Sequence, residues 1–273
     1  MNQTIGFIGG GNMASSLIGG LINGDVVKPH NIMVFDPSPE RAQELHTQYS
    51  IKIAESNEQL IQNSSVVVIA VKPQVLNAVL NPLASAFQAN PPLIVSVVAG
   101  ITANSIEQWL GGNVAIVRVM PNTPALIGQG ASGLYANDRV NDEQRVVASQ
   151  LVNAVGSSAW VDNENDIDSI TALSGSGPAY FMLFIQSLIE SAVNAGLEPE
   201  AAKTLAIKTA SGAAALIDSS DLPLQTLIDN VTSPGGTTEQ ALLSFERSNL
   251  KGVVDSAFNA AKNRSEEMAK ELG

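Results

Sequence analysis

The chain of 273 residues has no cysteine, only two histidines, and few aromatic residues, which make up 4% of it. Without cysteine there can be no disulfide, no thiolate nucleophile and no cysteine-ligated metal. His30 and His46 stand in ordinary polar contexts, so we expect no metal site of any kind. A core with so few aromatics must be mostly aliphatic, which favours a Val/Ile-rich parallel sheet with closely packed helices.

Positive charge is also scarce. Fourteen Lys and Arg stand against 26 Asp and Glu, a formal net charge of −12. Such a chain has no long-range attraction for nucleic acid or anionic membranes, so we expect neither as a partner. The N-terminus lacks a basic signal region, and no unbroken apolar run reaches membrane-spanning length. We therefore expect a cytoplasmic protein, whose anionic ligands are held by local donors.

The sequence begins with a dinucleotide-binding pattern. Residues 4–8 predict a buried strand, and Gly9, Gly11 and Ala14 follow at the spacing G-x-G-x-x-A. The first glycine permits a tight turn, the second lets a pyrophosphate approach the backbone, and the third small residue lets helix and strand pack closely. Helical spacing over residues 15–22 completes the pattern.

Cofactor preference stays open at the end of the second predicted strand, Ile32–Phe35. Asp36 follows it, 36 − 14 = 22 residues past Ala14, where an acidic residue holds the ribose hydroxyls of NAD(H). Ser38 and Arg41 offer a hydroxyl and a guanidinium for the 2′-phosphate of NADP(H). The same two residues equally suit a helix N-cap and a solvated first turn.

Three more apolar strands are predicted at residues 66–71, 93–98 and 114–120, with helices near 74–80 and 103–110 between them. Each strand ends in a turn, and the turns contain Lys72-Pro73, Ala99-Gly100 and Pro121-Asn122. Ligands bind beyond the carboxyl ends of strands in a doubly wound sheet, so these turns should converge on the nicotinamide half of the cofactor. Short strands at 130–135 and 158–161, with a helix at 142–154 between them, close this part.

From Asp166 onward the sequence predicts helices only, including one that starts at Pro199 and a last one at 251–271. Their alanine- and glycine-rich faces provide little bulk for a private core, which indicates a dimerisation unit. The predicted fold class is α/β: residues 1–162 form a Rossmann-like domain with a doubly wound, mostly parallel sheet, and residues 163–273 form an all-α domain for substrate binding and dimerisation.

The stretch Asp229–Glu239 gathers four hydroxyls, a proline and two glycines before another predicted helix. Ser233 or a neighbouring threonine is a natural N-cap, and an exposed helix entrance binds anions through its backbone N–H groups. A capped helix without a ligand is the alternative. Two consecutive glycines exceed what a cap requires, so the anion interpretation stays open.

Taken together, the motifs resemble the pyrroline-5-carboxylate reductase family in order and spacing across essentially the whole chain. The matching segments are 6–13, 71–73, 120–124, 174–180 and 232–239. The resemblance implies reduction of the cyclic imine 1-pyrroline-5-carboxylate to L-proline by NADPH or NADH, the last step of proline biosynthesis. It also implies a homodimer interlocked through the helical domain, and such dimers can assemble into decamers.

The resemblance also implies roles for individual residues. The residues expected at the cofactor pyrophosphate are Gly9, Gly11, Asn12 and Met13. The residues expected at its adenosine end are Asp36, Ser38, Arg41 and Asn57. The residues expected along the nicotinamide path are Val71, Lys72, Pro73, Ala99 and Asn122. The substrate carboxylate would be held by Ser233 and the amides of Gly235, Gly236, Thr237 and Thr238, with the Thr238 hydroxyl on the ring nitrogen. Asp36 stands where many members carry a small polar residue, which puts a preference for NADPH in doubt.

Two other functions compete with this one. β-Hydroxyacid dehydrogenases share the two-domain plan but use a lysine in the first turns of the helical domain, and residues 176–196 contain none. A non-catalytic nucleotide sensor would keep the glycine turn but would need no substrate site, so the 233–238 helix entrance argues against it. An iminium is already activated, so its reduction demands neither a metal nor a covalent nucleophile.

Overall fold

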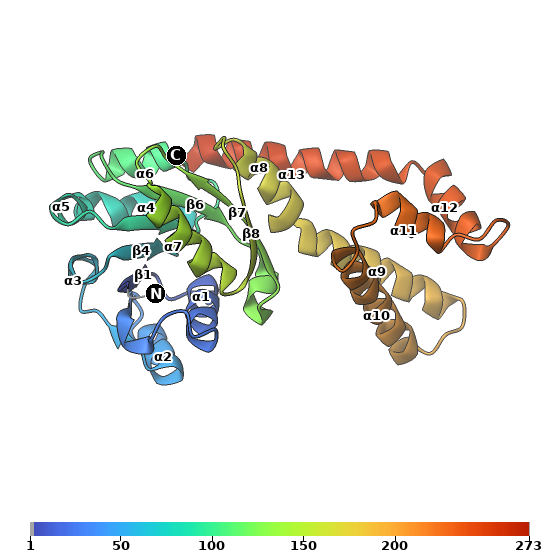
Figure 1. Ribbon diagram of the computed structural model, residues 1–273, viewed down its shortest axis with the longest axis horizontal. Helices are drawn as coiled ribbons and strands as arrows, with labels where there is room; N and C mark the ends of the chain where they lie inside the picture. The colour runs from blue at the N-terminus through green and yellow to red at the C-terminus, as the bar shows by residue number, and fades with distance from the viewer. Residues whose placement is uncertain (1–2, 273) are drawn as a thin grey trace. The chain divides into compact units, whose positions relative to one another are not determined.

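The computed structural model describes residues 3–272, which form two compact units. The first comprises the chain up to Ser176 together with the segment from Ala261 onward, and the second comprises Gly177–Ala260. Figure 1 shows the sheet and its helices in the first unit and helices alone in the second. The chain therefore has the α/β composition that the sequence predicts.

One eight-stranded sheet organises the first unit. Its strands lie in the order β3-β2-β1-β4-β5-β6-β7-β8, and every neighbouring pair is parallel except β6 and β7. Their bounds are β1 (Ile5–Ile8), β2 (Ile32–Phe35), β3 (Lys52–Ile53), β4 (Val66–Ile69), β5 (Leu93–Ser96), β6 (Ile116–Met120), β7 (Gly130–Ala136) and β8 (Gly156–Trp160). The predicted Rossmann-like, mostly parallel sheet is confirmed.

Helices cover both faces of this sheet because its central strands are apolar on both sides. In β4, Val66 and Val68 pack into one hydrophobic cluster, while Val67 and Ile69 pack into the other. The first cluster includes helices α1 (Asn12–Asn23), α2 (Pro39–Tyr49) and α7 (Asp142–Asn153). The second includes α3 (Asn57–Gln62), α4 (Pro73–Leu80), α5 (Ala84–Ala89) and α6 (Ala103–Trp109).

The strand order reverses direction at β1. This strand pairs in parallel with both β2 and β4, so the crossovers on its two sides diverge, and folds of this kind bind their ligands beyond the carboxyl end of the strand at this point. The glycine-rich turn that begins at Gly9 follows β1 directly and lies at this point. The sheet topology thus places the predicted cofactor motif where such folds bind their ligands.

A π-helical turn closes the first unit. Helix α8 (Asp166–Ile170) passes into Thr171–Gly175, where the N–H of Ser176 donates to the carbonyl of Thr171 over 2.8 Å, five residues back. A π turn of this kind inserts an extra residue and is frequent at functional sites. Nothing in the sequence pattern predicted it.

The regular secondary structure of the second unit, Gly177–Ala260, is all helical. It contains α9 (Gly177–Asn194), α10 (Pro199–Asp218), α11 (Leu224–Asn230), α12 (Thr237–Arg247) and the first part of α13 (Leu250–Leu272). The rings of Phe184 and Phe245 join α9 to α12, with centroids 6.1 Å apart. Many large apolar side chains stay exposed, including Phe181, Met182, Leu183, Leu205, Val253 and Val254. This unit cannot cover its own apolar surface.

The continuous helical stretch Asp166–Asn194 is, by length and average hydropathy, apolar enough to cross a membrane, and only 11% of its most apolar window is buried. Polar residues such as Ser187 and Glu190 interrupt this stretch, so it contains no unbroken apolar run of that length. The same exposed apolar side chains are what a subunit interface requires.

Candidate active site

The turn after β1 is shaped to receive a pyrophosphate. Gly9 has φ +97°, and a Cβ there would lie 2.8 Å from the carbonyl oxygen of Ala70, so only glycine fits. Gly11 has φ −65° and would carry a Cβ into open space, with no described atom within 4 Å apart from those of Gly11 itself and its two chain neighbours. Within the described chain no side chain caps α1 and no acidic residue stands in its first turn. Its exposed N–H groups fit an anionic cofactor.

Asp36 and Arg41 fix this turn from outside. The two carboxylate oxygens of Asp36 accept from the N–H groups of Gly10 (2.7 Å) and Ser38 (2.9 Å). The Arg41 Nε donates to the carbonyl of Gly10 over 2.5 Å. The peptide groups on both sides of Gly10 are therefore held by side chains from the end of β2 and the start of α2, which preorganises the loop.

Ser38 and Arg41 also take the helix-start roles that the sequence allowed. Ser38 is the N-cap of α2, where its Oγ accepts from the Arg41 N–H over 3.3 Å and donates to Glu40 over 2.8 Å. The Arg41 guanidinium pairs with Glu44 at 2.9 Å. A contact from either residue to a 2′-phosphate remains a prediction.

Asn57 carries an unpaired acceptor. Its side-chain oxygen is buried and has no hydrogen-bond partner within the part of the chain that the structure describes. Asn57 is the first residue of α3, directly after the N-cap Ser56. A buried acceptor without a donor is costly, so a ligand hydroxyl or amino group fits this position. The sequence predicted a contact between this residue and the adenosine side of the cofactor.

The turns after β4, β5 and β6 differ in whether their side chains already form hydrogen bonds within the protein. Lys72 is the exposed N-cap of α4 and Pro73 is its first residue, while Ala99 is half-buried after β5. Asn122 is buried, and its side chain donates to the Ser174 carbonyl (3.0 Å) and accepts from the Ala131 N–H (2.9 Å). Asn122 therefore ties β6, β7 and the π turn together, and its contact with a cofactor remains a prediction.

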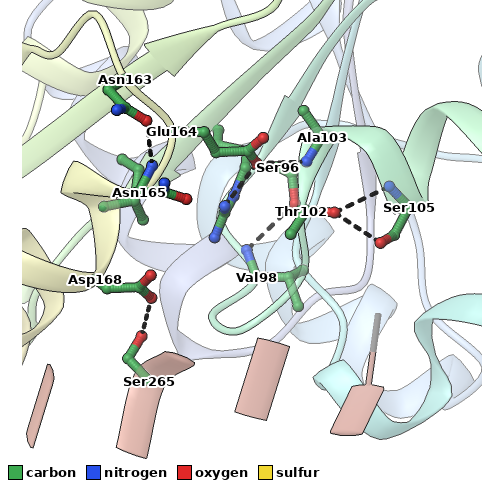
Figure 2. A network of polar contacts seen from close by, with 12 residues as sticks. Ser96, Val98, Thr102, Ala103, Ser105, Asn163, Glu164, Asn165, Asp168 and Ser265 are labelled. Carbon is green, nitrogen blue, oxygen red and sulfur yellow. Dashed lines mark hydrogen bonds and ion pairs between the residues drawn. The ribbon is translucent and has the colours of Figure 1, made fainter. Parts of the chain in front are cut away.

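A polar network that the sequence reasoning missed surrounds the start of α6 (Figure 2). One carboxylate oxygen of Glu164 accepts from Arg118 (2.7 Å) and from the backbone N–H of Ala103 (2.6 Å). Nearby, Ser265 donates to Asp168 over 2.6 Å. The available signal was Arg118 itself, a charge within an otherwise apolar strand, which cannot be buried without a partner.

Tyr135 pairs with Arg118 across β6 and β7 and responds to this charge cluster. Burial raises the pKa of its phenol, and the negative charges of Glu164 and Asp138 raise it further, while Arg118 opposes them. The protonation of Tyr135 therefore reports the local electrostatic field of the network.

The predicted substrate loop lies in the second unit, and its N-cap prediction was wrong. Helix α12 takes Gly236 as its N-cap, and no side chain among the described residues bonds to that helix start. Gly235 adopts φ +71° and reverses the chain just before it, which leaves Ser233 too early in the sequence to cap. The hydroxyls of this segment therefore do not occupy the first N–H groups of the helix.

Two of the predicted amides already have partners. The N–H of Gly235 donates to Glu239 over 2.8 Å, and that of Gly236 donates to the Ser233 carbonyl over 2.9 Å. The N–H groups of Thr237 and Thr238 open the helix and have no intrahelical acceptor. The structure thus joins Asp36 and Arg41 to the glycine turn, and it places the predicted cofactor residues in the first unit and Ser233–Thr238 in the second.

Comparison with known proteins finds oxidoreductases that are similar to the chain over almost its whole length. A family model described as pyrroline-5-carboxylate reductase dimerisation matches residues 164–268, and one described as NADP oxidoreductase coenzyme F420-dependent matches residues 4–100. A pyrroline-5-carboxylate reductase of Pseudomonas aeruginosa is 46% identical over 269 residues, which cover 98% of either chain.

Solved structures agree with the sequence matches. A pyrroline-5-carboxylate reductase from Coxiella burnetii has a TM-score of 0.95 at 39% identity, covering 98% of this chain and 99% of that one. A Plasmodium falciparum pyrroline carboxylate reductase with NADP bound has a TM-score of 0.86 at 35% identity and covers 98% of each chain.

The fold, the glycine turn and these matches define an NAD(P)-dependent oxidoreductase with a Rossmann-like first unit and a helical dimerisation segment. Within that class, the chain belongs to the pyrroline-5-carboxylate reductase family.

Proposed function

We propose that this chain reduces 1-pyrroline-5-carboxylate to L-proline with NADPH or NADH, the final step of proline biosynthesis. The observation that carries the proposal is the start of α12, where the N–H groups of Thr237 and Thr238 have no intrahelical acceptor and no side chain of the described residues caps the helix, while Thr238 adds a hydroxyl to the same turn. That arrangement suits a small molecule with a carboxylate next to a ring nitrogen, because one helix entrance can bind both groups.

The bound nicotinamide supplies the reducing equivalent, and the chain supplies position and charge. The N–H groups of Thr237 and Thr238 hold the carboxylate, and Ser233 adds a hydroxyl at the same loop. The Thr238 hydroxyl forms a hydrogen bond with the ring nitrogen, and this nitrogen gains electron density as the C=N bond is reduced. Such positioning removes much of the entropic barrier without a strong acid or a metal.

The cofactor is expected on the first unit. We propose that the glycine turn and the N–H groups of Asn12 and Met13 bind its pyrophosphate, and that Asn57 binds its adenosine side. Val71, Lys72, Ala99 and Asn122 are proposed to line its nicotinamide half. The open space above Gly11 supports the pyrophosphate assignment, and the buried oxygen of Asn57, which has no partner among the described residues, supports the adenosine assignment.

Asp36 should set the cofactor preference. Its carboxylate bonds to the N–H groups of Gly10 and Ser38 beside the glycine turn. We expect the adenosine ribose there, so the carboxylate would repel the dianionic 2′-phosphate of NADPH. Replacing Asp36 with serine should shift the ratio of kcat/KM for NADPH over NADH upward by about tenfold. Asp36→Asn keeps the shape without the charge and should shift the ratio in the same direction. An unchanged ratio in both variants would remove Asp36 from this role.

We also propose a functional division at residue 162/163, a homodimer that can extend to a decamer, and a cytoplasmic location without nucleic-acid or membrane partners. The dimerisation match that begins at residue 164 and the net charge of −12 support these proposals. The compact units themselves divide at 176/177 and 260/261, within or next to continuous helical stretches.

Light scattering of the purified chain tests the assembly. The exposed apolar side chains of α9 and α10 predict a mass of at least twice 28.5 kDa at micromolar concentration. Phe181→Asp places a charge on this surface and should lower the mass toward the monomer, whereas Glu190→Gln on the same helix α9 should not. A monomeric wild-type chain would contradict the proposal.

The activity itself is tested by following oxidation of NADPH and NADH with three additions: the cyclic imine carboxylate, a β-hydroxyacid or its keto form, and buffer. Oxidation with the imine alone supports the proposal. Turnover confined to the keto acid would favour a hydroxyacid dehydrogenase, and binding without turnover would favour a sensor.

A further inference from the structure

The loop between β5 and α6, residues 97–102, carries Ala99 and is held at both ends. At its start, the Ser96 Oγ accepts weakly from the Val98 N–H over 3.4 Å. At its end, the Thr102 hydroxyl caps α6 by accepting from the Ser105 N–H over 3.0 Å. The N–H of the next residue, Ala103, donates to Glu164 over 2.6 Å. The first residue of α6, where the loop ends, is thus held by the carboxylate of Glu164, which belongs to neither the loop nor the helix.

Glu164 is itself fixed by a buried cation. The Arg118 side chain is only 7% exposed and that of Glu164 only 21%, and the same Glu164 oxygen accepts from both Arg118 and Ala103. A buried ion pair has a defined geometry, because either charge left without its partner is strongly destabilising. The pair therefore connects β6, the segment after β8 and the start of α6 at one point. Figure 2 shows Glu164 next to Ala103 in this network.

The end of α13 packs against the turn of the same loop. Gly100 has φ +71°, and a Cβ there would lie 3.2 Å from the Cβ of Met268. Ser265, one turn earlier on α13, donates to Asp168 of α8 over 2.6 Å. Contacts at its start, turn and end leave the loop little freedom to shift relative to the sheet.

We propose that Glu164 is a positioning residue of the cofactor site: held by Arg118, its carboxylate fixes the start of α6 and so the loop that presents Ala99 to the nicotinamide half. Glu164 touches neither cofactor nor substrate in this role. The inference rests on the proposed placement of the nicotinamide beside Ala99. The adenosine half of the cofactor is proposed to bind at β1, β2 and α3, so Glu164 should not affect its binding.

Equilibrium binding measurements distinguish contacts to the nicotinamide half of the cofactor from contacts to its adenosine half, and they require no turnover. The dissociation constants of NADPH or NADH are compared with that of the fragment lacking nicotinamide, ADP-ribose or its 2′-phosphate. Glu164→Ala should weaken binding of the whole cofactor by about tenfold and leave the fragment within about twofold of wild type. Equal changes for cofactor and fragment, or no change in either, would overturn the inference.

Glu107→Ala is the matched control. Glu107 lies on the same helix α6 and also joins an arginine, Arg139, at 2.7 Å, but it lies near the C-terminal end of the helix. Losing this ion pair should leave the ratio of the two dissociation constants at the wild-type value. An equal shift in the control would contradict the proposal, because the effect would then follow from a general loosening of α6.

Should Glu164→Ala fail to fold, Glu164→Gln tests the same point, since its amide oxygen can still accept from Ala103 without the charge that fixes Arg118. The proposal predicts a smaller weakening in the same direction, again for the whole cofactor only. Spectrophotometric titration of Tyr135, assigned with Tyr135→Phe, should show a lowered phenol pKa because the negative charge of Glu164 is gone. A lowered pKa together with unchanged cofactor binding would overturn the positioning role.

The proposed function fails by a different observation. If the wild-type chain oxidises no NADPH or NADH with the cyclic imine, the reaction is wrong, yet the ratio of binding constants in Glu164→Ala still tests the loop. If the wild-type chain reduces the imine and the ratio does not move, only the role of Glu164 is lost.

Discussion

Replacing Thr238 with alanine is expected to lower kcat/KM for the cyclic imine by about 10²-fold, which corresponds to roughly 2.7 kcal/mol of transition-state stabilisation. The hydroxyl is the only group proposed to bond the ring nitrogen as that atom gains electron density. Because Thr238 lies in the helical unit and the cofactor turn lies in the other, the dissociation constant of NADPH or NADH should stay within about twofold of wild type.

Two variants of the same turn serve as controls. Thr238→Ser retains a hydroxyl and should recover most of the activity. Thr237→Ala removes the neighbouring, exposed hydroxyl but keeps the backbone N–H that is proposed to hold the carboxylate, so it should stay close to wild type. If Thr238→Ala keeps its kcat/KM, the hydroxyl has no part in the reaction and helix capping alone would explain this residue.

Gly11→Ala should abolish tight cofactor binding without unfolding the protein. The added Cβ meets no described atom within 4 Å beyond Gly11 itself and its chain neighbours, and φ is −65°, which alanine adopts freely. The N-cap position slightly disfavours alanine, while the reduced freedom of the unfolded chain favours it, so the free energy of unfolding should change by less than about 1 kcal/mol. The space that the methyl group enters is where a pyrophosphate must approach, so the dissociation constant should rise by more than about tenfold.

Gly9→Ala provides the contrast. Here φ is +97° and the new Cβ would lie 2.8 Å from the Ala70 carbonyl, so the protein should lose about 2 kcal/mol of stability or more. Urea unfolding and equilibrium binding, measured on both variants, separate the two glycines. Normal cofactor binding by Gly11→Ala would show that the pyrophosphate does not approach this turn.

The parts of the fold that were predictable are those in which one pattern determines the outcome. β4 is four β-branched residues in a row, Val66–Ile69, which only a strand buried on both faces accommodates easily. Helix α7 begins at Asp142 after a complete capping box of Asn141 and Gln144, and the sequence predicted its start at that residue. The glycine turn was predictable because its geometry requires Gly9 and Gly11 at one fixed spacing.

Other features depend on tertiary contacts that no local pattern contains. Strand β3 has two residues, Lys52 and Ile53, and exists because β2 offers it an edge to pair with. The π turn at Thr171–Gly175 lies where Ser174 meets Asn122 and Gly175 meets Met120, residues about fifty positions away. Neither feature has a signature in its own sequence.

The candidate site divides in the same way. Its residue types could be named from the sequence, since hydroxyls, glycines and a helix start are compatible with an anion site as well as with a capped helix that binds nothing. Their partners were not, because the Gly235 N–H bonds to Glu239 and both oxygens of Asp36 bond to backbone N–H groups. These contacts depend on the backbone path through Gly235 and Gly10, which sequence spacing does not specify. The ion pair of Glu164 and Arg118 joins residues 46 positions apart.

The most direct test of the account is the fate of a deuterium label. The wild-type chain is incubated with 1-pyrroline-5-carboxylate and NADPH or NADH deuterated at nicotinamide C4, and the product is analysed by mass spectrometry and NMR. We expect one L-proline for each cofactor oxidised, with deuterium at C5, the former imine carbon. Cofactor oxidation without proline, or proline that carries no deuterium from cofactor labelled on either C4 face, would contradict it.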